Sequence, residues 1–190
     1  MAGGPDGIMF DPFTERVLVL SHSAPNATVI DAKDGSVVGT IDLGGAPEQG
    51  VSDGRGHLYI DVEDKASVAV VDARTLAVTA HYDLSSKGAA PAGLAMDAKN
   101  NRLFACCRNP AVCLVLDAAD GRIIASLPIG AGTDGATFNP NTLEAFSSQG
   151  DGTLTVIKES SPASFEVEQN VQTPPFAKTC TLDAKTNRIL

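Results

Sequence analysis

The sequence has no tryptophan, and aromatic residues make up only 5% of it. This scarcity argues against repeats of the tryptophan–aspartate type, so packing between elements must rely on aliphatic side chains. Basic residues are also few. Lys and Arg number 14 against 23 Asp and Glu, the formal net charge is -9, and no basic cluster occurs. Because phosphate backbones and anionic membranes attract basic surfaces, we expect no nucleic-acid partner. No apolar run reaches the length of a membrane span.

The four cysteines carry no metal signature, because no CxxC pair occurs and no histidine lies at ligand spacing. They are Cys106, Cys107, Cys113 and Cys180. A turn at Asn109-Pro110 would place Cys106 opposite Cys113, where a disulfide could form in an oxidising compartment. The aligned positions of another copy hold Leu20 and Ala27, so a role as small strand residues is favoured.

What the sequence does contain is a repeat of about 40 to 45 residues. One anchor is the residue that ends a Val- and Ile-rich run, and it recurs at intervals of 41, 45 and 41 residues at Asp31, Asp72, Asp117 and Lys158. A second anchor recurs at intervals of 42, 44, 42 and 44 residues at Asp11, Asp53, Asp97, Asn139 and Asp183. Two independent anchors with one period indicate a true internal repeat.

Each unit divides into four short Val-, Ile- and Leu-rich segments, separated by turn residues such as Asn, Asp, Gly and Pro. In the third unit these predicted strands cover 93–96, 103–107, 112–116 and 122–129. A four-stranded meander cannot bury both of its faces alone, whereas packing successive meanders side by side buries them. The sequence therefore predicts an all-β fold, a β-propeller of four-stranded antiparallel blades within a single domain, residues 1–190.

We place the blades at about residues 4–45, 46–87, 88–130 and 131–173, and residues 174–190 as the start of a fifth. The segments from the second strand to the end of the third, beginning at Val17, Leu58, Leu103 and Glu144, align without a gap. Both ends of the chain cut a repeat, so we expect an incomplete ring. An incomplete ring leaves apolar blade faces and edges open, which predicts self-association.

The stretch SHSAPNATVIDAKDGSVVGTIDLGGAPE and its copies resemble the YVTN repeat of bacterial and archaeal β-propellers. Here VLVLS or LYIDV stands in place of the Tyr-Val-Thr-Asn that names the family. The resemblance covers nearly the whole chain and implies a longer protein of about seven blades with an export signal, hence a periplasmic or extracellular location. The first residues lack the basic and hydrophobic regions of a signal peptide, so the chain itself leaves its location open. The family implies a fold, not an activity.

Columns of the repeat that hold the same residue type are expected to be structural. The Asp11 and Asp31 columns would accept backbone N–H groups and close turns. The column of Arg16, His57, Arg102 and Arg188 would pair with turn carboxylates. We therefore expect function where the copies differ.

One such column begins the innermost strands, which line the channel of a propeller, and it holds Asp6, Glu48, Ala92, Asp134 and Lys178. Three carboxylates would then converge at the channel mouth, with Gln49 beside them. Hard cations take oxygen ligands from separate segments in this way, so Asp6, Glu48 and Asp134 are candidate ligands of a divalent metal. Lactonases of similar fold hold a catalytic metal near such a position. The alternative is that the carboxylates cap loops or meet channel water.

A second candidate surface, the loop face, comprises the loops that differ most in chemistry from blade to blade. Its residues are His22, Glu63, Asp64, Arg108, Asn109, Gln149 and Asp151. No catalytic residue is assigned, since adjacent strand residues such as Ser21 and His22 point to opposite sides. The leading hypothesis is a non-catalytic binding or scaffold propeller with a protein or small-molecule ligand and no cofactor. The alternative is a metal-dependent hydrolase, lactonase-like, or a relative of quinoprotein dehydrogenases, which would use the channel mouth.

Overall fold

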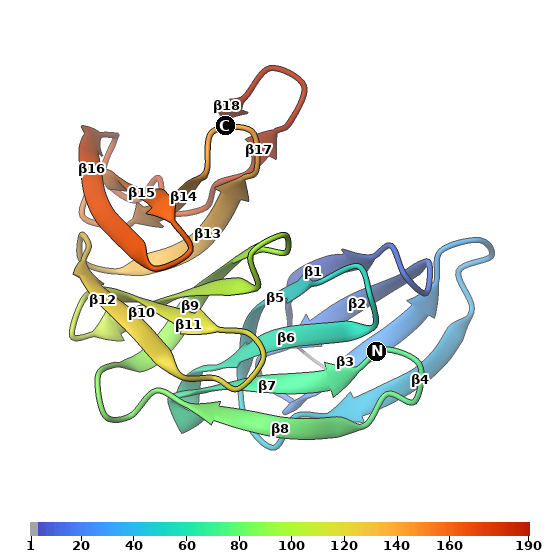
Figure 1. The fold of residues 1–190 in the computed structure, drawn as a ribbon. Helices are drawn as coiled ribbons and strands as arrows, with labels where there is room; N and C mark the ends of the chain where they lie inside the picture. The colour runs from blue at the N-terminus through green and yellow to red at the C-terminus, as the bar shows by residue number, and fades with distance from the viewer. Residues whose placement is uncertain (1–3) are drawn as a thin grey trace.

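The computed structural model describes residues 4–190, which form four antiparallel four-stranded sheets and a final strand pair (Figure 1). Blade one comprises β1 (Pro5–Asp11), β2 (Arg16–Ser21), β3 (Asn26–Asp31) and β4 (Val37–Asp42). Blade two comprises β5 (Pro47–Ser52), β6 (His57–Val62), β7 (Ser67–Asp72) and β8 (Val78–Asp83), with a 3-10 turn, η1 (Glu63–Lys65), after β6. In both blades the strands pair in sequence order, as expected for a meander.

The next two sheets repeat this plan. Blade three comprises β9 (Ala89–Asp97), β10 (Arg102–Asn109), β11 (Val112–Asp117) and β12 (Ile123–Pro128). Blade four comprises β13 (Thr133–Asn139), β14 (Glu144–Gln149), β15 (Thr153–Ser161) and β16 (Ser164–Gln172), and it is followed by the pair β17 (Leu182–Asp183) and β18 (Arg188–Ile189). The predicted β-propeller fold is thereby confirmed.

The first strand of every sheet lies innermost, so that β1, β5, β9 and β13 are neighbours in that order (Figure 1). The core lies between the blades because successive side chains of a strand point to opposite faces. On β6, Leu58 and Ile60 face the cluster shared with blade one, whereas Tyr59 faces the cluster shared with blade three. A third cluster, which includes the stacked rings of Phe104 and Phe138, joins blades three and four.

The turn column behaves as the sequence predicts. Each of its members accepts the backbone N–H of the residue two positions on, at distances of 2.7 to 3.3 Å, at Asp11, Asp53, Asp97, Asn139 and Asp183. Cys106 and Cys113 are direct cross-strand partners and both are free thiols buried in blade three.

Two details differ from the expectations. The first strand of blade three is longer than the predicted 93–96, because β9 begins at Ala89 and pairs with the long β10 up to Asn109. The ungapped alignment also fails in blade four, where the β14–β15 loop is one residue shorter. As a result Glu144, not its neighbour, stands opposite Lys158, in the register that Arg102 and Asp117 share.

This register places a reversed ion pair in blade four. Arg102 and Asp117 lie 3.1 Å apart, and Glu144 and Lys158 lie 3.7 Å apart with the signs exchanged. Opposite charges directly across an antiparallel pair stabilise it in either order. On the innermost strand β1, Ile8 and Phe10 are exposed. Within residues 4–190, no helix is long and apolar enough to cross a membrane.

Candidate binding cavity at the channel mouth

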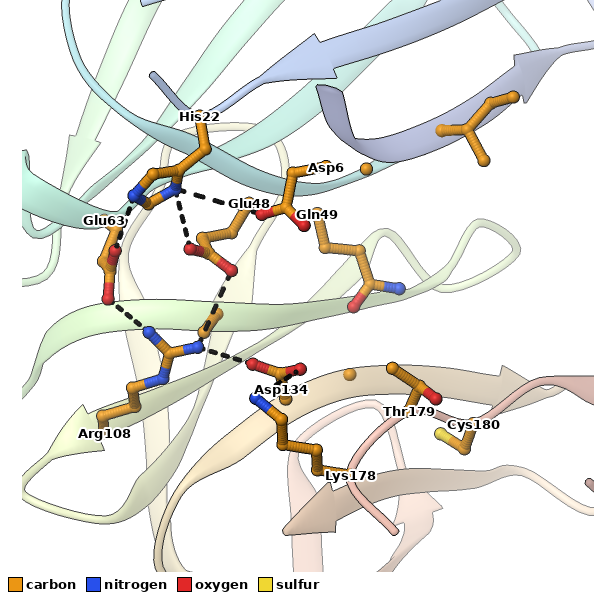
Figure 2. A pocket seen from close by; sticks show the side chains of 14 residues that line it. Asp6, His22, Glu48, Gln49, Glu63, Arg108, Asp134, Lys178, Thr179 and Cys180 are labelled. Carbon is orange, nitrogen blue, oxygen red and sulfur yellow. Dashed lines mark hydrogen bonds and ion pairs between the residues drawn. The ribbon is translucent and has the colours of Figure 1, made fainter. Parts of the chain in front are cut away.

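A cavity of about 580 Å³ opens at the end of the innermost strands where the β2–β3, β6–β7 and β10–β11 loops also lie. Its lining combines residues of the channel-mouth and loop-face candidates (Figure 2). The sequence predicts two separate surfaces, the channel mouth and the loop face. The structure instead brings Asp6, Glu48 and Asp134 together with His22, Glu63 and Arg108.

The reason is a second repeat column. His22, Glu63 and Arg108 each lie six residues after the first residue of the second strand of their blade, which is Arg16, His57 and Arg102, respectively. His22 and Glu63 directly follow β2 and β6, whereas Arg108 lies near the end of the longer β10. The second strand lies beside the innermost one, so this position and the start of the innermost strand meet at the same end of the blade. The sequence therefore contained the signal that joins the two groups, but only the alignment of this loop column reveals it.

Arg108 lies at the centre of the charged cluster and is bound by three carboxylates from two other blades (Figure 2). Its Nη1 donates to Glu63 Oε1, and its Nη2 lies 2.7 Å from Asp134 Oδ1 and 3.7 Å from Glu48 Oε2. Its Nε donates to the Thr133 carbonyl at 3.1 Å. Burial alone would lower the pKa of the guanidinium, but the surrounding carboxylates raise it, so Arg108 is a fixed positive charge.

His22 lies near two of these carboxylates, Glu48 and Glu63, and near Asp6. Its Nδ1 lies 3.0 Å from Glu48 Oε1 and 4.0 Å from Asp6 Oδ2, and its Nε2 lies 3.7 Å from Glu63 Oε2. Along the sequence no carboxylate adjoins His22, because its carboxylate neighbours lie in other strands. Although Nδ1 is buried and close to Glu48, the approach lacks hydrogen-bond geometry.

Glu48 is the most perturbed acid of the cavity. Burial raises its pKa to about 7, an increase that Glu63 and Asp6 reinforce and that Arg108 and His22 oppose. A carboxyl group with such a pKa exchanges its proton close to neutral pH. Its affinity for a cation therefore depends on pH in the physiological range.

Gln49 was predicted to bind at the channel mouth, but its amide is committed to the fold. Its Oε1 accepts the N–H groups of Leu94 and Ala136 at 3.0 and 2.9 Å, and its Nε2 donates to the Ala136 carbonyl at 2.8 Å. One side chain of blade two thereby ties the innermost strands of blades three and four. Gln49 lines both this cavity and a neighbouring depression between the innermost strands, so it lies where the two meet.

The remaining loop-face residues lie outside the cavity lining. Asp64 accepts the Ala46 N–H at 2.8 Å, and Asp151 accepts the Ala131 N–H at 2.6 Å, so both carboxylates close loops. Asn109 ends the long β10 opposite Ala89. Gln149 was predicted on the surface but is fully buried. Its Oε1 accepts a hydrogen bond from the Thr153 hydroxyl at 3.1 Å.

Lys178 belongs to the same repeat column as Asp6, Glu48 and Asp134, but the sequence did not single it out as a binding residue. Its Nζ lies 3.2 Å from Asp134 Oδ2, so Asp134 contacts two cations, Lys178 and Arg108. Thr179 and Cys180, which also precede β17, line the same side of the cavity (Figure 2). The start of the fifth blade thus contributes to the cavity as well as to the fold.

The donor set that suits a metal ion is therefore Asp6, His22 and Glu48, since one ligand atom from each lies within 4.8 Å of the others. Ligands bound to one zinc ion at about 2.1 Å are separated by roughly 3 to 4 Å, a range that includes the two distances measured from His22 Nδ1. Asp134, a predicted ligand, already has its oxygens on Arg108 and Lys178.

Comparisons with known proteins support the fold. No protein-family model matches the sequence, and no curated protein matches it. Among solved structures, the chain is similar to Kuenenia stuttgartiensis hydrazine synthase, with a TM-score of 0.77 and 20% sequence identity over 89% of this chain. The match covers 49% of that protein's chain, so this chain spans about half its length. At this identity the likeness establishes a shared β-propeller fold.

Proposed function

We propose that this chain belongs to a non-catalytic binding propeller of YVTN type, whose channel-mouth cavity holds a divalent cation and a small polar ligand beside it. The observation that carries the proposal is the convergence of Asp6, His22 and Glu48, which come from blades one and two, on one side of the cavity.

The charges in the cavity support a cation at this point. Arg108 and Lys178 face Asp134, Glu63 and one oxygen of Glu48, whereas Asp6 and the second oxygen of Glu48 have no guanidinium or ammonium partner among the described residues. A cation beside His22 would compensate this remaining charge. It would also stabilise the ionised form of Glu48, which burial disfavours.

The ligand types favour zinc over calcium. Calcium takes oxygen ligands, whereas an imidazole nitrogen with two carboxylates suits zinc and leaves a coordination position for a bound molecule. The cavity of about 580 Å³ is large enough for a small molecule next to such an ion. Lys178 and Arg108, on the opposite side, would favour a ligand with an acidic group.

The proposal is tested by titrating the chain with zinc and with calcium at pH 8, using calorimetry after removal of bound metal. We expect one saturable zinc site, at least about tenfold weaker in His22→Ala and in Glu48→Gln, because each change removes one ligand. Asp64→Asn is the matched control, since Asp64 is a carboxylate outside the cavity lining, and its affinity should equal that of the unmodified chain. Absence of saturable binding, or equal loss in all three variants, would overturn the proposal.

A metal-dependent, lactonase-like hydrolase is the second candidate, and the pKa of Glu48, raised to about 7, is the observation that favours it. A carboxylate with this pKa beside a metal site could accept a proton from an attacking water. A panel of lactones with added zinc distinguishes the two functions. Turnover that is lost in Glu48→Gln would support the hydrolase, and zinc binding without turnover would support the binding module.

A further inference from the structure

The end of the blades opposite the cavity contains a second groove, which arises from a single difference between repeats. In blade one, Arg16 reaches across to blade two, where its Nη1 donates to the Ala73 carbonyl at 3.1 Å. In blade three, Arg102 likewise reaches blade four, where its Nε donates to the Pro162 carbonyl at 2.7 Å. A long guanidinium side chain thus spans two of the blade junctions at this end.

At the junction of blades two and three the corresponding residue is His57, which does not span it. Its Nδ1 lies 3.0 Å from Asp53 Oδ2 within its own blade. The carbonyl of Ala118, which corresponds to that of Ala73, accepts the hydroxyls of Tyr59 and Tyr82 at 3.1 and 2.9 Å. The replacement of arginine by a shorter side chain leaves a groove of about 490 Å³ that these two tyrosines line.

The aromatic rings along this groove lie side by side. The ring centroids of Tyr59 and Tyr82 are 6.4 Å apart, and those of His57 and Tyr59 are 6.5 Å apart. Val70 and Ala80 continue the same wall. Such a surface suits a flat aromatic ring, which gains both apolar burial and favourable ring–ring contacts.

The polar groups at the groove's edge are mainly donors. Arg55 Nη2 donates to Asn101 Oδ1 at 2.5 Å, and its Nε lies 3.9 Å from Asp53 Oδ2. Arg55 and Asn101 both line the groove, and their remaining N–H groups are available to a ligand. The carboxylate of Asp53 is already satisfied, because it accepts the backbone N–H groups of Arg55 and His57 at 2.7 and 3.0 Å in addition to the imidazole.

Other carboxylates near the tyrosines are also paired. Asp117 lies 3.1 Å from Arg102 Nη1 and 3.8 Å from Arg122 Nη2, and Asp120 lies 4.0 Å from Arg122 Nε. With these charges compensated, N–H groups of Arg55 and Asn101 are the donors left at the groove. This donor set is complementary to an oxyanion.

We propose that the groove between blades two and three is a binding site for a small aromatic carboxylate. The ring of the ligand lies against Tyr59 and Tyr82, and its carboxylate accepts hydrogen bonds from Arg55 and Asn101. The site lies at the opposite end of the blades from the channel-mouth cavity and is independent of a metal ion.

Benzoate is a suitable probe, and its binding to the chain is measured by shifts of the tyrosine and histidine ring signals in NMR spectra. We expect saturable, millimolar binding of benzoate. Benzylamine should bind much more weakly because its charge is reversed, and cyclohexanecarboxylate should bind more weakly because its ring is not aromatic. Zinc chelation should leave benzoate binding unchanged, which separates this site from the channel mouth.

His57→Arg is the informative variant, because it restores the residue type of blades one and three. The new side chain should fill the groove and weaken benzoate binding by about tenfold or more, while thermal stability is kept. Arg55→Gln should weaken it similarly. Arg74→Gln, which removes a charge from the same end of blade two next to Phe13, is the control and should have no effect. Preferential binding of benzylamine, or benzoate binding that survives both His57→Arg and Arg55→Gln, would overturn the proposal.

Discussion

The two ends of the blades use the repeat in opposite ways. At the turn end, the same residue type recurs, and Asp11, Asp53 and Asp97 each close a turn within their own blade. At the channel mouth, equivalent positions hold three different residues, His22, Glu63 and Arg108. Glu63 of blade two contacts both His22 of blade one and Arg108 of blade three.

This difference separates local from shared chemistry. A turn aspartate needs only the backbone that follows it, so one solution serves every copy. Residues that converge on a common cavity must differ, because like charges would repel one another there. Three carboxylates accordingly surround the single guanidinium of Arg108.

The strongest test of the comparison is Arg108→Met. It keeps an apolar stem but leaves Glu48, Glu63 and Asp134 without their common counter-charge. We expect the free energy of unfolding at pH 7.5 to fall by about 2 to 3 kcal/mol in urea denaturation, because removing one member of a partly buried ion network leaves the other charges uncompensated.

Arg122→Met is the control for this loss. Arg122 also lies near two carboxylates, Asp117 and Asp120, but its side chain is 66% exposed, compared with 28% for Arg108. We expect this substitution to cost less than about 1 kcal/mol, because exposed ion pairs contribute only about 0.2 to 1 kcal/mol. Equal effects of the two substitutions would contradict the special role assigned to the channel mouth.

The turn end should respond more weakly and should tolerate asparagine. Asp97→Ala removes acceptors of the Lys99 and Asn100 N–H groups, at 2.9 and 3.2 Å, and we expect a loss of about 1 to 2 kcal/mol. Asp97→Asn should cost less than about 0.5 kcal/mol, since Asn139 already performs this role in blade four. Denaturation of both variants measures the difference, and equal losses would show that charge, not turn closure, matters at this column.

A further prediction concerns pH. The pKa of Glu48 is raised from an ordinary value of 4.5 to about 7 in the folded chain, so the folded state binds the proton more tightly than the unfolded one. Its contribution to stability is present below pH 4.5 and is lost as the pH rises through 7.

Glu48→Gln removes this titration. With metal chelated, we therefore expect the stability of the variant relative to the unmodified chain to rise steadily between pH 5 and pH 8, because only the unmodified chain has to ionise Glu48 in this range. Thermal unfolding across this range measures the gain, and a difference that does not vary with pH would contradict the raised pKa.

Much of the fold could be predicted from the sequence because blade formation is local. Short Val- and Ile-rich runs, turn residues and two recurring anchors are enough to define four antiparallel strands per repeat. The register of blade four was not predictable in this way. Its loop lacks one residue, and the shift is visible only because Glu144 pairs with Lys158.

The sequence by itself determined the repeat, the β-propeller fold, the turn carboxylates and the set of charged residues from which the cavity is built. Only the tertiary structure decided which of them meet: it placed His22 beside Glu48, gave Asp134 to Arg108 and Lys178, and committed Gln49 to the innermost strands. The physical reason is that turns depend on neighbours along the chain, whereas the cavity depends on how blades pack side by side, which brings together residues many positions apart.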